Sequence, residues 1–120
     1  MATILFIDDD ILTLETYEKM VDFLGHTALL ADTCDKALEI LSREAVDLML
    51  LDRQLSDMDG FEVLKKIRVN PPFMDIPIVM VSASHNVFAE RAKAEGAKDF
   101  LSKPLLTADL QELIDQYTTP

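Results

Sequence analysis

Acidic side chains, a hydroxyl group and a lysine each follow a short apolar run of the sequence. These residues are Asp8, Asp9, Asp10, Asp52, Ser82 and Lys103. Carboxylates that meet in a partly desolvated cleft repel one another, so either some are protonated or a cation lies among them. Oxygen ligands with only a few carboxylates suit Mg²⁺, which keeps several waters and binds phosphate oxygens. A nearby lysine can hold a phosphoryl oxygen as a point charge. These residue types therefore indicate phosphate chemistry, provided that the fold brings them together.

Five runs of the sequence have the length of β-strands. They span Thr3–Ile7, Thr27–Ala31, Asp47–Leu51, Ile76–Val81 and Lys98–Ser102. The first, third and fourth are almost wholly apolar, which is typical of central parallel strands covered on both faces.

Amphipathic stretches that favour helices lie between these runs. Their predicted inward-facing residues are Leu14, Tyr17, Val21 and Leu24, then Ala37, Leu38 and Leu41, then Phe61, Leu64 and Ile67, and finally Leu110, Leu113, Ile114 and Tyr117. Thr33 and Thr107 are predicted helix caps. Another helix is expected over residues 86–95, closed by Gly96.

Strand and helix thus alternate five times, which predicts one α/β domain over residues 1–120, a doubly wound (βα)₅ sandwich with a parallel sheet. In an open parallel sheet, binding sites form outside the carboxyl ends of the strands. The acidic, hydroxyl and lysine side chains all follow such ends, so we expect them to converge on one rim. Periodicity alone does not fix the strand order.

The net negative charge disfavours partners that are themselves negatively charged. The chain has 11 basic and 22 acidic residues and a net charge of −11, which disfavours direct binding to nucleic acid or to an anionic membrane surface. No apolar run approaches the ~20 residues of a membrane span, and the start of the chain does not resemble a secretory signal. The single cysteine, Cys34, cannot form an internal disulfide. We expect a cytoplasmic protein with Cys34 as a small buried helix residue.

Four segments carry a resemblance to a known family. ILFIDDD, DLMLLDRQLSDMDG, PIVMVSAS and GAKDFLSKP resemble, in order and spacing, the signature segments of response-regulator receiver domains. One segment alone would not suffice, since an apolar run followed by aspartate is common. The resemblance covers essentially the whole chain and implies a flavodoxin-like five-stranded sheet in the order 2-1-3-4-5.

The resemblance also assigns roles to single residues. It implies that Asp52 is the phospho-acceptor and that the metal ion is Mg²⁺, held by Asp8, Asp9, Asp52 and the backbone carbonyl of Gln54, with Asp8 acting mainly through water. Lys103, which precedes a cis-type Pro104, would neutralise charge on the transferred group. Ser82 would be the switch hydroxyl and Phe100 the switch aromatic.

The function implied is that of a signalling switch rather than an enzyme. Such a domain accepts a phosphoryl group from a sensor histidine kinase or a histidine phosphotransfer protein. It catalyses only its own phosphorylation and slow dephosphorylation, with Gln54 and Ser84 flanking the path of the hydrolytic water. Phosphorylation would change a partner-binding face formed by the predicted fourth helix, fifth strand and fifth helix. The downstream partner, and whether the receiver is stand-alone or part of a longer regulator or hybrid kinase, stay open, with stand-alone slightly favoured.

Some positions depart from the family pattern or have a simpler interpretation. Ser56 stands where proline is common, and Arg53 where a small apolar residue is frequent. Asp10 is interpreted as a helix N-cap rather than a ligand. Asp57 and Asp59 are interpreted as turn and cap residues.

The sequence disfavours three other functions. A phosphohydrolase of the haloacid-dehalogenase type needs a carboxylate two residues after its nucleophile, where this chain has Gln54. A flavodoxin cradles phosphate with hydroxyls and amides, where this chain has Asp8, Asp9 and Asp10. A degenerate, binding-only receiver is disfavoured by the complete set of Asp8, Asp9, Asp52, Ser82 and Lys103.

Overall fold

The computed structural model describes residues 1–83 and 88–118. Its elements, in chain order, are β1 (Thr3–Ile7), α1 (Ile11–Phe23), β2 (Thr27–Ala31), α2 (Cys34–Arg43), β3 (Leu48–Asp52), α3 (Gly60–Arg68), the short 3₁₀ helix η1 (Pro71–Phe73), β4 (Ile78–Ser82), α4 (Ala89–Ala94), β5 (Asp99–Ser102) and α5 (Thr107–Thr118).

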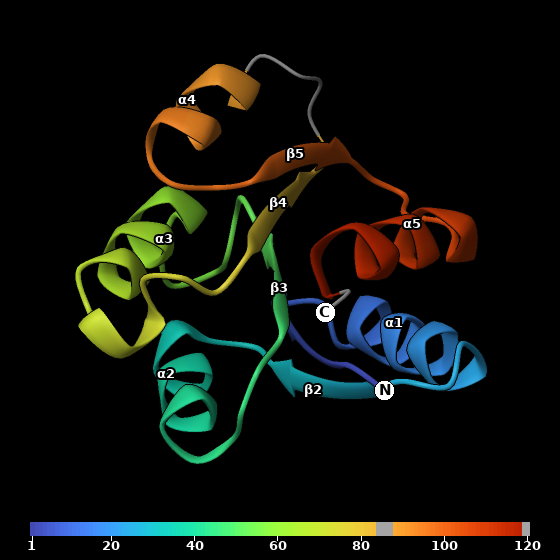
Figure 1. Cartoon of the computed structure of the whole chain (residues 1–120). Coiled ribbons are helices and arrows are strands. Elements are labelled where there is room, and N and C mark those ends of the chain that lie inside the picture. Colours follow the sequence, from blue (N-terminus) through green and yellow to red (C-terminus); the bar gives the residue numbers. More distant parts are fainter. Residues whose placement is uncertain (84–87, 119–120) are drawn as a thin grey trace.

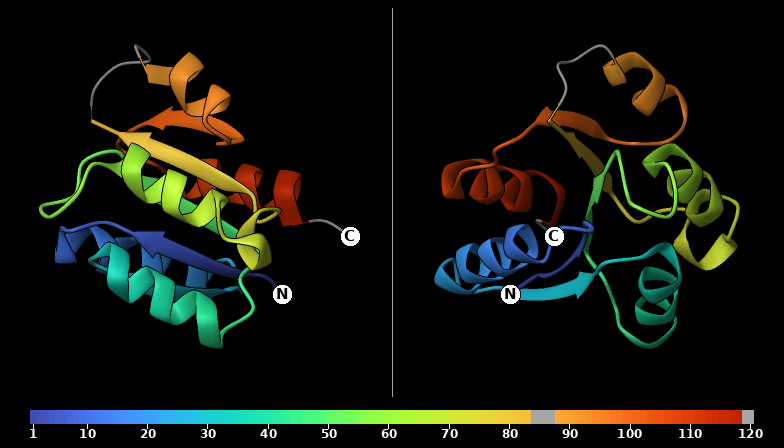
Figure 2. Two further views of the ribbon diagram at one scale, coloured as in Figure 1. Left: turned by 90° about the vertical axis from the view of Figure 1, so that its left-hand side faces the viewer. Right: turned by 180° about the vertical axis from the view of Figure 1, so that it is seen from behind.

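The five strands form one parallel sheet in the order β2-β1-β3-β4-β5, which confirms the predicted fold (Figure 1). Helices α1 and α5 cover one face of the sheet, and α2, α3 and α4 cover the other. Figure 2 shows that the strands run in the same direction and that the N-terminus and the last turn of α5 lie at the edge where the strands begin. The carboxyl ends of the strands therefore meet at the opposite edge.

Alternation along the strands divides the core into two layers. Leu5, Met49 and Met80 pack beneath α2, α3 and α4. Phe6 and Leu50, on the opposite face, pack beneath α1 and α5. Because β1, β3 and β4 are buried on both faces, their sequences are nearly continuous apolar runs.

Helix starts follow the predicted chemistry in three places. Asp10, Thr33 and Asp59 each accept a hydrogen bond from a main-chain N–H in the first turn of the helix that follows, as N-cap residues do. The predicted cap Thr107 is wrong, because it is the first residue of α5. The Asp109 carboxylate instead accepts a bond from Leu106 N–H there, at 2.7 Å.

Several predicted boundaries shift by one or two residues. β3 runs Leu48–Asp52 rather than Asp47–Leu51, because Asp52 pairs with Val81 in the sheet and the pairing of β3 with β1 starts only at Leu48. Asp47, just before the strand, bonds to Thr3 through its N–H and its carboxylate. β4 and β5 begin later than predicted, at Ile78 and Asp99. Of the predicted fourth helix, the described part is Ala89–Ala94, and its predicted start at residue 86 lies outside the described residues.

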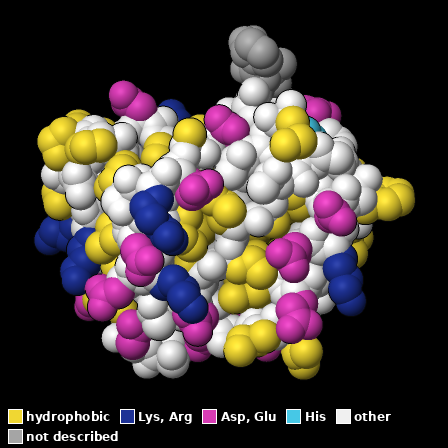
Figure 3. All heavy atoms as spheres, turned by 90° about the horizontal axis from the view of Figure 1, so that it is seen from below, with side chains coloured by type: hydrophobic (Ala, Val, Ile, Leu, Met, Phe, Trp, Pro, Cys, Tyr) yellow, Lys and Arg dark blue, Asp and Glu magenta, His cyan; other side chains and the backbone are white. Residues whose placement is uncertain are grey.

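Surface charge is spread rather than gathered on the face seen from below. There, acidic side chains lie among hydrophobic and basic ones (Figure 3). In the described ranges, no helix combines the length and apolar character needed to cross a membrane.

Candidate functional site

Three carboxylates meet where β1 and β3 end. Asp8 directly follows β1, Asp52 is the last residue of β3, and the two strands are paired up to Ile7 and Leu51. One oxygen each from Asp8, Asp9 and Asp52 lies within 4.8 Å of the others, a spacing at which one ion can contact all three. Asp8 is buried and Asp9 is exposed, so the cluster opens to solvent on the Asp9 side.

Lys103 supplies a positive charge to the cluster from the end of β5. Its Nζ lies 2.7 Å from Asp8 Oδ2 and 3.5 Å from Asp52 Oδ1. The backbone of Lys103 is fixed by donation to the Ser82 carbonyl at 2.8 Å, and a cis peptide bond joins it to Pro104. Burial lowers the pKa of Lys103, but Asp8 and Asp52 outweigh that effect and hold it above its ordinary value. Lys103 is therefore a cation at neutral pH.

The negative charge of the cluster is only partly compensated. Burial, and then the nearby Asp8, raise the pKa of Asp52 from its ordinary 3.8 to about 6, although Lys103 and the Gln54 N–H act in the opposite direction. Within the cluster, three carboxylates face the one ammonium of Lys103. An excess of negative charge on oxygen ligands, open to water on one side, fits a divalent cation of the Mg²⁺ type.

The loop after Asp52 is held tightly against β3. Gly60 N–H donates to the Arg53 carbonyl at 2.6 Å, and an isolated bridge pairs Gln54 with Asp59. A Cβ at Gly60 would overlap the main-chain oxygen of Asp52, so only glycine allows this approach. The loop thereby fixes the backbone on which Asp52 and Gln54 lie, while the Gln54 residue itself is exposed.

Ser82 and Phe100 lie on the neighbouring strands β4 and β5. Ser82 is buried at the end of β4, and Phe100 is buried in the core layer beneath α4, together with Ala92 and Ala97. The Ser82 hydroxyl accepts a bond from Arg53 Nε at 3.4 Å. The same guanidinium lies over the ring of Phe88, 4.4 Å from its centroid. The residue after Asp52 thus links the end of β4 to the start of α4.

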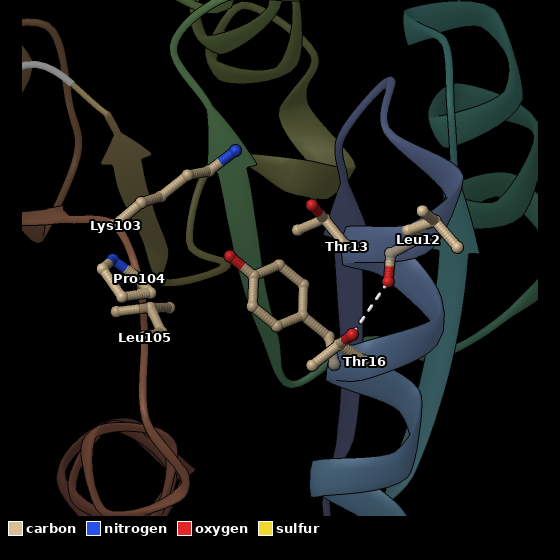
Figure 4. Close-up of a pocket in the computed structure, with 7 residues that line it drawn as sticks. Leu12, Thr13, Thr16, Lys103, Pro104 and Leu105 are labelled. Atoms are coloured by element: carbon tan, nitrogen blue, oxygen red, sulfur yellow. Dashed lines mark hydrogen bonds between the residues drawn. The ribbon is translucent and has the colours of Figure 1, made fainter.

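A pocket of about 250 Å³ adjoins the cluster between the start of α1 and the segment after β5 (Figure 4). It is lined by Leu12, Thr13, Thr16, Tyr17, Lys103, Pro104 and Leu105. In Figure 4 the ammonium of Lys103 points toward the end of β3, away from Pro104 and Leu105. Burial raises the pKa of Tyr17 to about 12, so its phenol is neutral at pH 7.

Comparison with known proteins decides the family. The response regulator receiver domain model matches residues 4–115. This chain belongs to the receiver domain family. The receiver domain is 42% identical over 81 residues to the two-component response regulator ARR3 of Arabidopsis thaliana, an alignment that covers 66% of this chain and 35% of that protein.

Two further relatives cover nearly the whole receiver domain. A hybrid signal transduction histidine kinase L of Dictyostelium discoideum is 29% identical over 98% of this chain, which corresponds to 7% of that protein. The crystal structure of the receiver domain of sensor histidine kinase PA1611 from Pseudomonas aeruginosa, with a magnesium ion coordinated in its active-site cleft, is 25% identical. It superposes with a TM-score of 0.85 and covers 97% of this chain and 96% of that one. The chain thus spans only a small part of the two curated relatives.

The receiver domain brings the predicted site residues to one edge of the sheet. Asp8, Asp9, Asp52 and Lys103 form one cluster, and Ser82 lies one residue beyond the strand partner of Asp52. Phe100 lies in the core layer rather than in the cluster. Ser84, predicted to flank the path of the hydrolytic water, lies outside the described residues.

Sequence reasoning missed the contacts of Arg53. In the sequence Arg53 is only a departure from the family pattern, yet in the structure it contacts both Ser82 and Phe88. The available signal was a long cation beside the predicted acceptor, where a small apolar residue is usual.

Proposed function

We propose that this receiver domain accepts a phosphoryl group on Asp52 and acts as a phosphorelay switch. The donor is a phosphohistidine of a sensor histidine kinase or a histidine phosphotransfer protein. The observation that supports this most is the meeting of Asp8, Asp9 and Asp52 with one ammonium, 3.5 Å from the Asp52 oxygen. A nucleophile, ligands for a cation and a fixed positive charge are what in-line phosphoryl transfer requires.

The transfer forms one bond and breaks one. An Asp52 oxygen attacks the phosphorus while the bond from phosphorus to the histidine nitrogen breaks. The leaving imidazole keeps that electron pair and takes up a proton. With a pKa of about 6, Asp52 is mostly ionised at pH 7 and available as the nucleophile. Lys103, already placed between Asp8 and Asp52, stabilises negative charge on the phosphoryl oxygens.

Asp8, Asp9 and Asp52, with the Gln54 carbonyl, are the proposed holders of Mg²⁺. The charge excess and the oxygen-only donors of the cluster fit this ion. When bound, Mg²⁺ supplies Lewis-acid neutralisation of charge on the transferred group. Asp8 has a second task, because its Oδ1 accepts a bond from Asp10 N–H at 2.9 Å while its Oδ2 contacts Lys103. Asp8 therefore fixes the turn into α1 and the lysine together.

The donor protein is proposed to dock beside the pocket next to Lys103. Ile11, Leu12 and Leu106 are 61%, 73% and 60% exposed and flank the cluster at the start of α1 and the end of the β5–α5 connection. Large exposed apolar side chains gathered near a reactive group are typical of protein contacts. A docked donor would cover these residues and present its phosphohistidine to Asp52.

Phosphorylation is proposed to alter the face formed by α4, β5 and α5. A phosphoryl group adds about two negative charges and three acceptor oxygens, which favour movement of the buried Ser82 hydroxyl toward Asp52. Phe100, buried beneath α4, can then repack. The result is a population shift between two packings of one fold, and a downstream partner binds one packing more tightly than the other.

Acetyl phosphate tests the transfer without a kinase. Incubation with acetyl phosphate and Mg²⁺ is expected to add the mass of one phosphoryl group to the intact chain, and EDTA is expected to prevent the addition. Lys103→Ala is expected to slow the reaction about 100-fold, the usual effect of removing one group that stabilises developing charge. Lys98→Ala, at an exposed lysine near the other end of β5, serves as the matched control. Equal labelling in EDTA and in Mg²⁺ would contradict the proposal.

A further inference from the structure

Arg53 is fixed in the backbone and has two partners for its side chain. Its N–H donates to the Val81 carbonyl at 2.9 Å and its carbonyl accepts from Gly60 at 2.6 Å. Its Nε lies 3.4 Å from Ser82 Oγ, and its guanidinium carbon lies 4.4 Å from the centre of the Phe88 ring. One side chain thus contacts a buried hydroxyl at the end of β4 and the aromatic residue that directly precedes α4.

The contacts continue from Phe88 into α3 and α4. The Phe88 ring meets the Phe61 ring edge-on at 5.9 Å, and the guanidinium of Arg91 lies over Phe61 at 4.0 Å. Arg53 is therefore the end of a connected row of side chains that joins β3 to the α4 side of the molecule. A planar guanidinium can stack on a ring and donate a hydrogen bond in the plane at the same time, which the ammonium of lysine cannot do.

We propose that Arg53 is a positioning residue that couples the phosphorylation state of Asp52 to the start of α4. Without the phosphoryl group, it holds Ser82 and Phe88 in the packing described here. A phosphoryl group on the adjacent Asp52 competes for both contacts, since its oxygens attract the guanidinium and the Ser82 hydroxyl. When the guanidinium turns toward these oxygens, it leaves the Phe88 ring, and the start of α4 repacks.

This inference rests on the proposed function, and it adds a second route to α4. Phe100 lies beneath α4 in the core, whereas Phe88 lies at its start, half-buried and close to Arg53. The two routes differ in what they need. The route through Arg53 requires a cation with a flat face beside the acceptor, and the Phe100 route does not.

Fluorescence can follow the start of α4 directly, because the chain contains no tryptophan. Phe88→Trp places a single indole beneath the guanidinium of Arg53, in the position of the Phe88 ring. Indole is a good partner for a cation. Emission is recorded before and after treatment with acetyl phosphate and Mg²⁺, and intact mass on the same samples gives the phosphorylated fraction. Arg53→Met keeps an unbranched side chain without the charge. Arg91→Met is the matched control, since it removes the other contact between a cation and a ring.

In the Phe88→Trp parent, phosphorylation is expected to change the emission. Adding Arg53→Met is expected to remove more than about half of that change at equal phosphorylated fraction, because the resting packing is already released. Arg91→Met is expected to keep most of the change. Amide NMR shifts of Ser82 and Phe88 in Arg53→Met without the tryptophan repeat the comparison if the indole disturbs packing.

The outcomes separate this inference from the proposed function. A phosphorylated parent whose emission does not respond, or responds equally with Arg53→Met, would overturn the coupling and leave phosphorylation intact. A parent that gains no phosphoryl mass would overturn the proposed function and the coupling with it.

Discussion

Asp52→Asn is predicted to stabilise the metal-free protein at pH 7, although it removes the proposed acceptor. The Asp52 side chain is only 11% exposed, and burial together with Asp8 raises its pKa to about 6. The ionised form of such a carboxyl group has a higher free energy in the folded chain than in the unfolded chain, so its ionisation destabilises the fold. Asparagine has nearly the same shape and no charge, and Lys103 keeps its contact with Asp8 at 2.7 Å.

The size and pH dependence of this effect follow from the pKa. The folded carboxyl binds its proton more tightly than the unfolded one, so protonation stabilises the fold and ionisation destabilises it. The pKa of Asp52 is 3.8 in the unfolded chain and about 6 in the folded chain. This difference lowers the free energy of unfolding at pH 7 by about 3 kcal/mol, since each pKa unit is worth about 1.4 kcal/mol. The advantage of Asp52→Asn should therefore be about 3 kcal/mol at pH 7, decline as the pH falls through 6, and nearly vanish below about 4.

Urea unfolding between pH 4 and 8 in EDTA measures the difference. Asp57→Asn, at an exposed carboxylate in the same loop, is the control and is expected to show no such pH-dependent gain. Mg²⁺ should stabilise the wild type more than Asp52→Asn, because a tenfold excess over Kd adds about 1.4 kcal/mol to a protein that binds it. A lower stability of Asp52→Asn at pH 7 without Mg²⁺, or a difference equal at pH 4 and pH 7, would refute the reasoning.

Three further predictions concern the loop after Asp52, the main-chain contacts of Arg68 and the lifetime of the phosphorylated form. Gly60→Ala should destabilise the fold by about 2 kcal/mol in urea unfolding and slow acetyl-phosphate labelling, because the added Cβ overlaps the main-chain oxygen of Asp52; an unchanged stability would contradict the close approach. Arg68→Ala should lower the free energy of unfolding by about 2 kcal/mol, because the guanidinium makes four hydrogen bonds to the main-chain carbonyls of Phe73, Met74 and Gly96. Arg43→Ala, at an exposed ion pair, should lower it by less than about 0.5 kcal/mol; equal losses would show that the four bonds of Arg68 add nothing. The acyl phosphate should decay over minutes, and Gln54→Ala should change that rate because the amide can bind the hydrolytic water; identical decay would remove Gln54 from the mechanism.

Much of the fold could be predicted from the sequence because burial on both faces leaves continuous apolar runs. β1 and β2 were predicted with the observed bounds, and the strand order implied by the resemblance is confirmed. The one-residue shift of β3 could not be predicted, because it depends on whether Asp47 or Asp52 pairs in the sheet. Asp47 bonds to Thr3, 44 residues away in the sequence, in two ways: its N–H donates to the Thr3 carbonyl, and its carboxylate accepts from Thr3 N–H.

The candidate site was predictable to the extent that it consists of residues at strand ends. Asp8, Asp9, Asp52 and Lys103 meet because parallel strands end at the same edge of the sheet. The contacts of Arg53 were not predictable, because they depend on a long side chain selecting one rotamer between β4 and the start of α4. A local pattern carries no information on that choice.

Mapping the phosphoryl group to a residue tests the central claim most directly. The chain is labelled with acetyl phosphate and Mg²⁺, digested at acid pH, where acyl phosphates survive, and sequenced by mass spectrometry. The predicted result is a single base-labile phosphoryl group on Asp52 and none in Asp52→Asn. A phosphoryl group on Asp8 or Asp9, or labelling that persists in Asp52→Asn, would contradict the account.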